Sequence, residues 1–107
     1  VIRSIYQASQ IDLASEFNQD LEYAKKLLNE HNADQCLKYL SSLKDRVWDR
    51  ADMSLKSRLL TLMGAAHLDQ ENNNEAGKIF IEALRYDPEA EKVLANAALG
   101  YFLVKDL

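Results

Sequence analysis

The sequence predicts an all-α fold of stacked antiparallel helical hairpins, and three observations lead to that prediction. Only three Gly and one Pro interrupt the 107 residues, whereas a β-sandwich needs a turn about every 8–12 residues. Hydrophobic residues recur at steps of three and four, the period of a helix face, and no comparable run alternates with period two. The breaks between these stripes are short and polar, so consecutive helices become antiparallel neighbours.

Five hydrophobic stripes define the expected helices. In chain order they are Leu21, Ala24, Leu27 and Leu28; Cys36, Leu37, Leu40 and Leu43; Leu59, Leu60, Met63 and His67; Ala76, Ile79, Phe80, Ala83 and Leu84; and Val93, Leu94, Ala97, Ala98 and Tyr101. Residues 1–16 have the pattern of a further amphipathic helix, which we interpret as the tail of a preceding unit.

The breaks contain residues that begin or end helices. Asp34 is expected to cap the second helix at its N-terminus, and Asp52 or Ser54 the third. In the third break, residues 71–74, an asparagine is expected to take the left-handed conformation. Pro88 ends the fourth helix, because the residue before a proline avoids the α region.

Small and large residues follow a specific spacing in the second half of the chain. Counted from Gly64, a large residue lies four positions before and His67 three after, and small, aromatic, small and proline residues follow at 12, 16, 19 and 24 positions. This spacing resembles the tetratricopeptide repeat. The matching positions are Leu60, Gly64, His67, Ala76, Phe80, Ala83 and Pro88. The sequence departs from the family where Leu60, Met63 and His67 replace tryptophan, leucine and tyrosine, each by a residue that can fill the same packing position.

The resemblance divides the chain into repeats within one domain, 1–107. A step of 34 residues leads from Leu60, Gly64 and His67 to Leu94, Ala98 and Tyr101. A backward step of 40 leads from Ala76, Phe80 and Ala83 to Cys36, Leu40 and Leu43, so about six residues are inserted within 44–54. We therefore expect a degenerate repeat at 17–56, a well-matched repeat at 57–90 and a partial repeat or capping helix at 91–107. The start at Val1 and the partial last repeat lead us to expect a piece of a longer protein.

Composition and motifs argue against several classes of function. The net charge of −4 lacks the basic footprint of a nucleic-acid-binding protein, and no apolar stretch reaches the length of a membrane span. We expect His67 to fill a packing position and the single cysteine, Cys36, to be buried, so neither is expected to bind a metal. Without a nucleophile motif or a glycine-rich phosphate loop, we expect no catalysis and no cofactor. The absence of a secretory signal pattern leads us to expect a cytoplasmic protein.

The resemblance also implies a binding surface, because the first helices of successive tetratricopeptide units line a concave groove that receives a partner's segment or helix. The partner-binding candidates are Lys25, Asn29, Arg58, Leu62, Lys92, Asn96, Leu99 and Phe102. Further groove positions are Asn18, Leu21, Glu22, Thr61, Ala65 and Asp69. The chaperone-binding members of the family clamp a terminal carboxylate with polar residues. We reject that variant here, because Thr61, Leu62 and Ala65 occupy positions where the clamp needs polar residues.

These observations lead to the hypothesis of a non-catalytic module that binds a protein or peptide partner, with Lys25, Arg58 and Lys92 orienting the partner through charge. The alternative hypothesis is a regulatory or substrate-presenting segment of a larger enzyme, such as a transferase or a signalling protein. The last helix is apolar almost all round. Some of Leu99, Phe102, Leu103 and Val104 are therefore expected to form an exposed patch, through which the chain forms a homodimer or docks on the rest of a longer protein.

Overall fold

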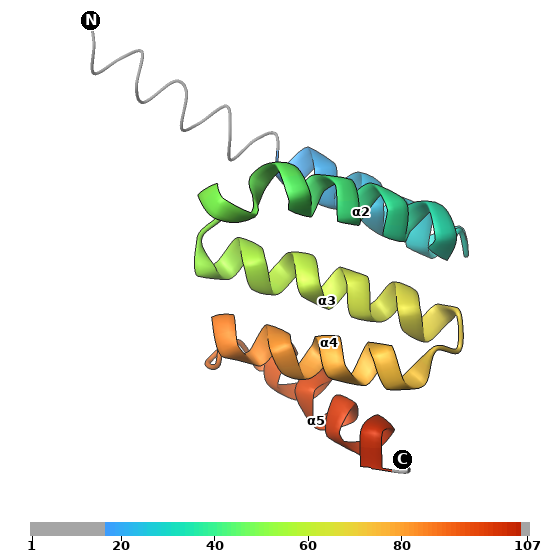
Figure 1. Ribbon diagram of the computed structural model, residues 1–107, viewed down its shortest axis with the longest axis vertical. Helices are drawn as coiled ribbons and strands as arrows, with labels where there is room; N and C mark the ends of the chain where they lie inside the picture. The colour runs from blue at the N-terminus through green and yellow to red at the C-terminus, as the bar shows by residue number, and fades with distance from the viewer. Residues whose placement is uncertain (1–16, 106–107) are drawn as a thin grey trace, which may run out of the picture.

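The computed structural model describes residues 17–105, and its regular elements in that range are helices, with no strand (Figure 1). A helix over residues 17–29 is followed by α2 (Ala33–Val47), a 3₁₀ turn η1 (Trp48–Arg50), α3 (Met53–Asp69), α4 (Asn73–Tyr86) and α5 (Glu91–Lys105). The prediction of an all-α fold is confirmed. The helix expected over residues 1–16 lies outside the described residues.

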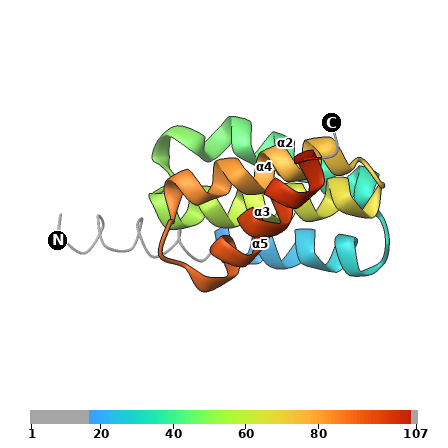
Figure 2. The same ribbon diagram turned by 90° about the horizontal axis from the view of Figure 1, so that it is seen from below.

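The helices stack in chain order and alternate between two layers. Helix 17–29, α3 and α5 lie on one side of the stack, and α2 and α4 lie on the other (Figure 2). Residues expected to hold an insertion form the end of α2, the turn η1 and the link to α3. The connection from α2 to α3, which contains η1, is the longest one between the described helices, and the alternation of layers continues across it.

The two turns that close successive hairpins have the same geometry, 40 residues apart. His31 and Glu71 both have positive φ, 59° and 63°. The N–H of the following residue, Asn32 or Asn72, donates to the carbonyl five positions back, at 2.9 Å in both turns. The N–H groups of His31 and Glu71 donate three positions back, at 3.0 and 2.9 Å. Both helices thus end in a Schellman motif, and the 40-residue step predicted from side-chain spacing is present in the backbone.

The helix-capping predictions were correct at some positions and wrong at others. Asp52 caps α3, since its Oδ1 accepts a hydrogen bond of 2.8 Å from the Leu55 N–H. The prediction for Asp34 was wrong, because α2 begins at Ala33 and Asp34 lies in its first turn. The left-handed residue of the third break is Glu71 and not an asparagine, because the Schellman motif has its left-handed residue directly after the C-cap, which is Gln70 for α3. α4 ends at Tyr86, two residues before the proline, as expected.

Two contiguous groups of buried side chains make up the core. The larger group joins helix 17–29, α2 and α3 and includes Phe17, Cys36, Leu40 and Leu43. The smaller one joins α3, α4 and α5 through Leu60, Ala83 and Val93. The predicted stripes supply most of the buried residues, which confirms their helical period.

Two close approaches between helices depend on glycine. A Cβ on Gly64 would lie 2.6 Å from Cε1 of Phe80, which confirms the expected contact between α3 and α4. A Cβ on Gly77 would lie 2.8 Å from the carbonyl oxygen of Gly100, and a Cβ on Gly100 would lie 2.7 Å from the carbonyl oxygen of Gly77. The backbones of α4 and α5 therefore touch where these two glycines meet.

Helix α5 packs on α4 with one face and exposes the opposite one. Val93, Ala97 and Gly100 are buried, and Leu103 and Val104 approach Gly77. Two of the four candidates for the exposed patch, Leu103 and Val104, are thus partly buried against α4. The other two, Leu99 and Phe102, are exposed, as are Leu94, Ala98 and Tyr101. The positions in α5 that correspond to the packed residues Leu60 and Gly64 therefore face outward.

Candidate functional site

A groove of about 510 Å³ runs along the layer formed by helix 17–29, α3 and α5. Helix 17–29 and α5 lie behind α2 and α4 in the view of Figure 1. The groove is lined by Leu21, Lys25, Ser54, Ser57, Arg58, Thr61, Leu62, Asp87, Ala90, Glu91, Lys92 and Val93. It therefore joins residues from three helices and from the turn before α5.

The bottom of the groove is apolar and its rim carries cations. Leu21 and Val93 are almost fully buried, at 1% and 6% exposure. Lys25, Arg58 and Lys92 are exposed, and each comes from a different helix of this layer. An apolar base with a few polar groups at the edge is the usual composition of a ligand-binding cleft.

The cations of the rim differ in their pairing. Lys25 Nζ lies 3.2 Å from Glu22 Oε1, an exposed pair within one helix that contributes little to stability. Among the described residues no carboxylate oxygen lies within 4 Å of the charged nitrogens of Arg58 or Lys92. Asp87 and Glu91 also line the groove. The rim therefore carries both signs of charge, with one more cation than carboxylates.

One polar group in the groove wall lacks a partner. Ser57 is fully buried, and its Oγ has no hydrogen-bond partner within the described part of the chain. Thr61, one turn later, donates its hydroxyl to the Ser57 carbonyl at 2.8 Å. Leaving a buried hydroxyl without a partner costs about 1–3 kcal/mol.

The groove contains half of the partner-binding candidates. Lys25, Arg58, Leu62 and Lys92 line it, as do Leu21 and Thr61. The remaining candidates do not line the groove; they are Asn29, Asn96, Leu99 and Phe102, with Asn18, Glu22, Ala65 and Asp69. Sequence reasoning missed the other lining residues, which are Ser54, Ser57, Asp87, Ala90, Glu91 and Val93. Asp87 and Ala90 lie in the turn before α5, where helical spacing gives no signal.

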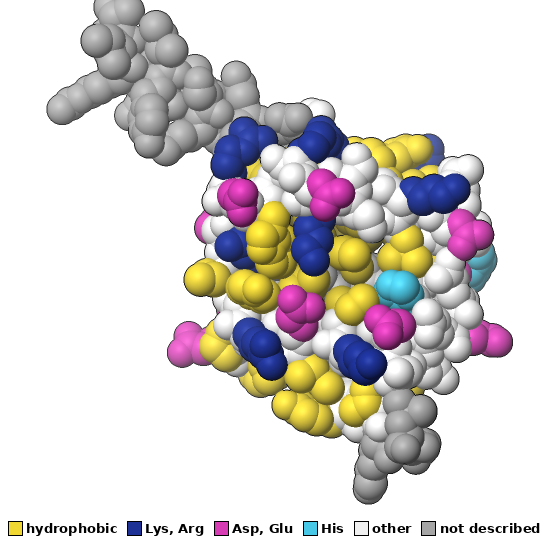
Figure 3. Space-filling view, viewed as in Figure 1, with side chains coloured by type: hydrophobic (Ala, Val, Ile, Leu, Met, Phe, Trp, Pro, Cys, Tyr) yellow, Lys and Arg dark blue, Asp and Glu magenta, His cyan; other side chains and the backbone are white. Residues whose placement is uncertain are grey.

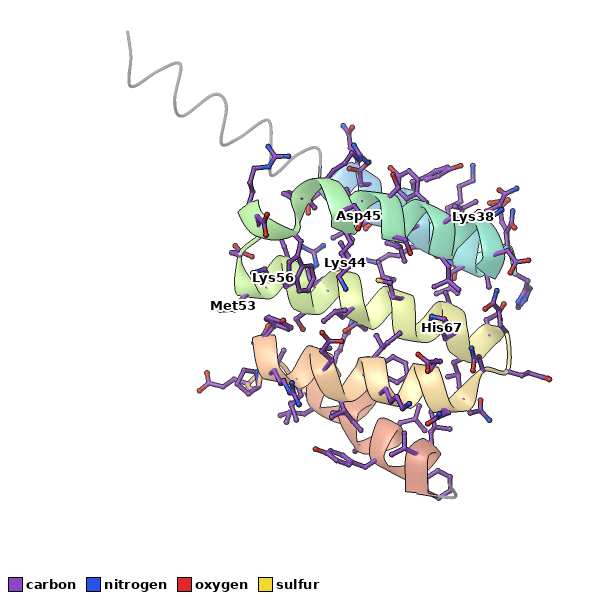
Figure 4. All side chains as sticks on the ribbon, viewed as in Figure 1. Lys38, Lys44, Asp45, Met53, Lys56 and His67 are labelled. Atoms are coloured by element: carbon purple, nitrogen blue, oxygen red, sulfur yellow. The ribbon has the colours of Figure 1, made fainter. Side chains whose placement is uncertain are left out.

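A cluster of aromatic and basic side chains lies where α2, η1 and α3 meet. The rings of Trp48 and Tyr86 pack edge to face, with centroids 5.4 Å apart. Lys44 Nζ and Lys56 Nζ lie 4.8 and 5.2 Å from the centre of the Trp48 ring, and Figure 4 labels the two lysines close to each other. The viewed face mixes hydrophobic, basic and acidic side chains (Figure 3). We interpret these contacts as a structural link between hairpins.

The two histidines and the cysteine take part in packing and turn contacts. His67 is partly buried in α3, where Figure 4 labels it. His31 Nδ1 lies 3.3 Å from Asp69 Oδ1, which links the two hairpin turns. Cys36 is fully buried, as expected, and its Sγ donates to the Ala24 carbonyl at 3.4 Å. Burial raises the pKa of the Cys36 thiol, which disfavours the reactive thiolate.

Tyr39 of α2 makes its contacts with helix 17–29 and does not line the groove. Its hydroxyl donates to Asp20, and its ring meets that of Tyr23 edge to face, with centroids 4.8 Å apart. Burial, together with the hydrogen bond to Asp20, raises the pKa of Tyr39 to about 12.

Comparison with known proteins finds no family model, no curated protein and no solved structure that matches the chain. In residues 17–105, no helix has the length and apolar character that crossing a membrane requires. The same residues contain no group of three or more His, Cys, Asp or Glu side chains placed to hold a metal ion.

Proposed function

We propose that the chain is a non-catalytic helical-repeat module that binds a peptide segment or helix of another protein in the groove between helix 17–29, α3 and α5. The observation that carries this proposal is the meeting of Lys25, Arg58 and Lys92, from three different helices, over an apolar base. These three cations are the ones that the resemblance to tetratricopeptide repeats marks for orienting a partner. The resemblance itself rests on residue spacing.

The groove favours a partner segment of defined chemistry. Its base offers Leu21, Leu62 and Val93 to apolar side chains, whose burial supplies most of the binding free energy. Arg58 and Lys92 offer charge to a carboxylate, while Asp87 and Glu91 at the same end repel a second one. We therefore expect the segment to combine apolar residues with one well-placed acidic side chain.

Selection of peptides from a random displayed library, followed by fluorescence polarisation with the enriched peptides, tests the proposal. Enriched peptides are expected to contain apolar residues and at least one acidic residue. Arg58→Ala and Lys92→Ala should each weaken their binding about 5- to 10-fold, since each removes a charge that the peptide meets.

Lys38→Ala is the matched control for these variants. Lys38 is an exposed lysine of α2, on the other layer of the stack (Figure 4), so its removal changes the net charge by the same amount without touching the groove. Peptides that bind the wild type and are equally insensitive to all three variants would place binding elsewhere. A library that yields no enriched peptide would contradict the proposal as well.

A further inference from the structure

Two lysine side chains converge on the ring of Trp48, the only tryptophan of the chain. Lys44 Nζ lies 4.8 Å and Lys56 Nζ 5.2 Å from the ring centre, and Lys56 Nζ also lies 5.8 Å from the centre of the Tyr86 ring. All four residues are partly buried, and they come from α2, η1, α3 and α4. Residues of four elements therefore hold the two ammonium groups at one place.

The two charges are not neutralised within the described part of the chain. Asp45, Asp49 and Asp52 are close to the lysines in sequence, yet no carboxylate oxygen of residues 17–105 lies within 4 Å of either lysine nitrogen. The two nitrogens are no farther apart than the Debye length, which is about 10 Å at 0.1 M salt, so they repel each other. The face of an aromatic ring attracts each ammonium group but carries no net charge. An anion bound between the two nitrogens would remove this repulsion.

Packing between the hairpins does not account for the two lysines. The rings of Trp48 and Tyr86 already pack together against the core around Leu60 and Ala83, and this apolar contact links the hairpins without any charge. The end of α4, the next helix of the same layer, is followed by a turn that has no 3₁₀ element. The alternation of layers therefore does not require this arrangement either.

A phosphoryl group has the chemistry that fits two adjacent ammonium groups. At neutral pH it carries a charge of about −1.5 to −2, which matches two positive charges, whereas a carboxylate neutralises only one. Each ammonium group has three N–H donors, and the oxygens of a tetrahedral phosphoryl group point in different directions, so two of them can each accept from a different lysine. Lysine binds phosphate in proteins as a point charge.

We propose that Lys44 and Lys56, positioned by the rings of Trp48 and Tyr86, bind the phosphoryl group of a small phosphate monoester or of a phosphorylated side chain. Both sources present the same dianionic oxygens and differ in what is attached to them, so separate probes can distinguish them. None of these four residues lines the groove. This inference is therefore independent of the proposed peptide binding.

The fluorescence of Trp48 tests the site, because both lysines lie against the only tryptophan ring. Titration with sodium phosphate near neutral pH, with the ionic strength kept constant by sodium chloride, should give a saturable change that is half complete at about 1–10 mM. Lys44→Gln and Lys56→Gln should each raise this concentration at least about 5-fold, since each removes one of the two charges. Lys38→Gln, at an exposed lysine earlier in α2 (Figure 4), should leave it unchanged.

O-phosphoserine and a short phosphoserine peptide distinguish the two sources. A phosphopeptide that binds at least about 10-fold more tightly than inorganic phosphate, while the same peptide with serine does not bind, would identify a phosphorylated side chain as the ligand. Equal binding of the three phosphorylated probes would identify a small monoester.

Circular dichroism melts check that each variant remains folded. The proposal is overturned if neither the fluorescence nor the indole N–H resonance of Trp48 gives a saturable response up to about 50 mM phosphate. It is also overturned if neither Lys44→Gln nor Lys56→Gln weakens the response, or if Lys38→Gln weakens it as much.

Discussion

The contact between Gly77 and Gly100 makes a prediction that follows from distances alone. An added Cβ on either residue would meet the carbonyl oxygen of the other at 2.8 or 2.7 Å. The obstacle is backbone, so a change of side-chain rotamer cannot relieve it. Gly77→Ala must instead push α4 and α5 apart along their contact, and Gly100→Ala must do the same.

Two opposing contributions set the change in unfolding free energy of each variant. Overpacking of a tight contact costs about 1–3 kcal/mol, while alanine gains about 1 kcal/mol over glycine inside a helix. Each single variant is therefore expected to lose about 0–2 kcal/mol of unfolding free energy. Comparison of Ser41→Ala with Ser41→Gly, at an exposed position of α2, measures the propensity term, so that the packing cost can be obtained by difference.

The double variant is the sharper test, because both substitutions require the same separation of α4 and α5. Once the first has moved the helices apart, the second meets less resistance. The double variant should then lose less packing energy than the sum of the single ones, by at least about 0.5 kcal/mol. Urea denaturation with unchanged m-values measures this. If the losses add within error, or if Gly77→Ala gains the full propensity term, the helices do not touch at these glycines.

Three other features lead to expected outcomes. Asp52→Ala should lower the unfolding free energy by about 1 kcal/mol in urea melts, whereas Asn72→Ala should have little effect, since Asn72 occupies a cap position without a side-chain hydrogen bond. The pKa of Tyr39 near 12 lies above its unfolded value. The stabilisation that the protonated Tyr39 hydroxyl gives the folded state is therefore complete below about pH 10 and is lost as the pH rises toward 12. Tyr39→Phe should flatten the dependence of unfolding free energy on pH in that alkaline range. Cys36 should resist a thiol reagent in the native protein and react once urea unfolds it; rapid native labelling would contradict its burial.

The helices and the contact of Gly64 with Phe80 could be predicted because their signals are local or periodic, whereas the contact of Gly77 with Gly100 was not predicted. Hydrophobic residues at steps of three and four identify the buried faces, and the spacing of Gly64 to Phe80 places a small residue opposite a ring. The proline after Asp87 marks a helix end for steric reasons alone. Such features need no knowledge of the rest of the chain.

The sequence contains no comparable signal for the geometry of the two turns. The left-handed position that ends a helix is most often glycine, yet here His31 and Glu71 occupy it. Their propensity for this conformation is low, and the hairpin imposes it because the backbone hydrogen bonds of the Schellman motif require it. The sequence could not reveal that Glu71 rather than Asn72 takes this conformation.

The residues that line the groove could be predicted only in part. Lys25, Arg58 and Lys92 could be assigned by their spacing in the sequence, and they lie on three helices of the same layer. Leu99 and Phe102 lie further along α5 and do not reach the groove, because its α5 residues come from the first turn of that helix. Only the packing of the turn between α4 and α5 against α3 brings Asp87 into the same wall.

Ser57, in the buried wall of the groove, provides the last prediction. Its Oγ is buried without a hydrogen-bond partner among the described residues, so Ser57→Ala, which deletes this oxygen, removes a polar group whose burial costs free energy. Ser57→Ala should therefore leave the unfolding free energy unchanged or raise it by up to about 1 kcal/mol, helped by the helix propensity of alanine. Thr61→Val, which removes the hydroxyl bonded to the Ser57 carbonyl, should lower it by about 0.5–1.5 kcal/mol. A Ser57→Ala variant that loses stability would contradict this expectation, because the hydroxyl would then have a hydrogen-bond partner within the fold.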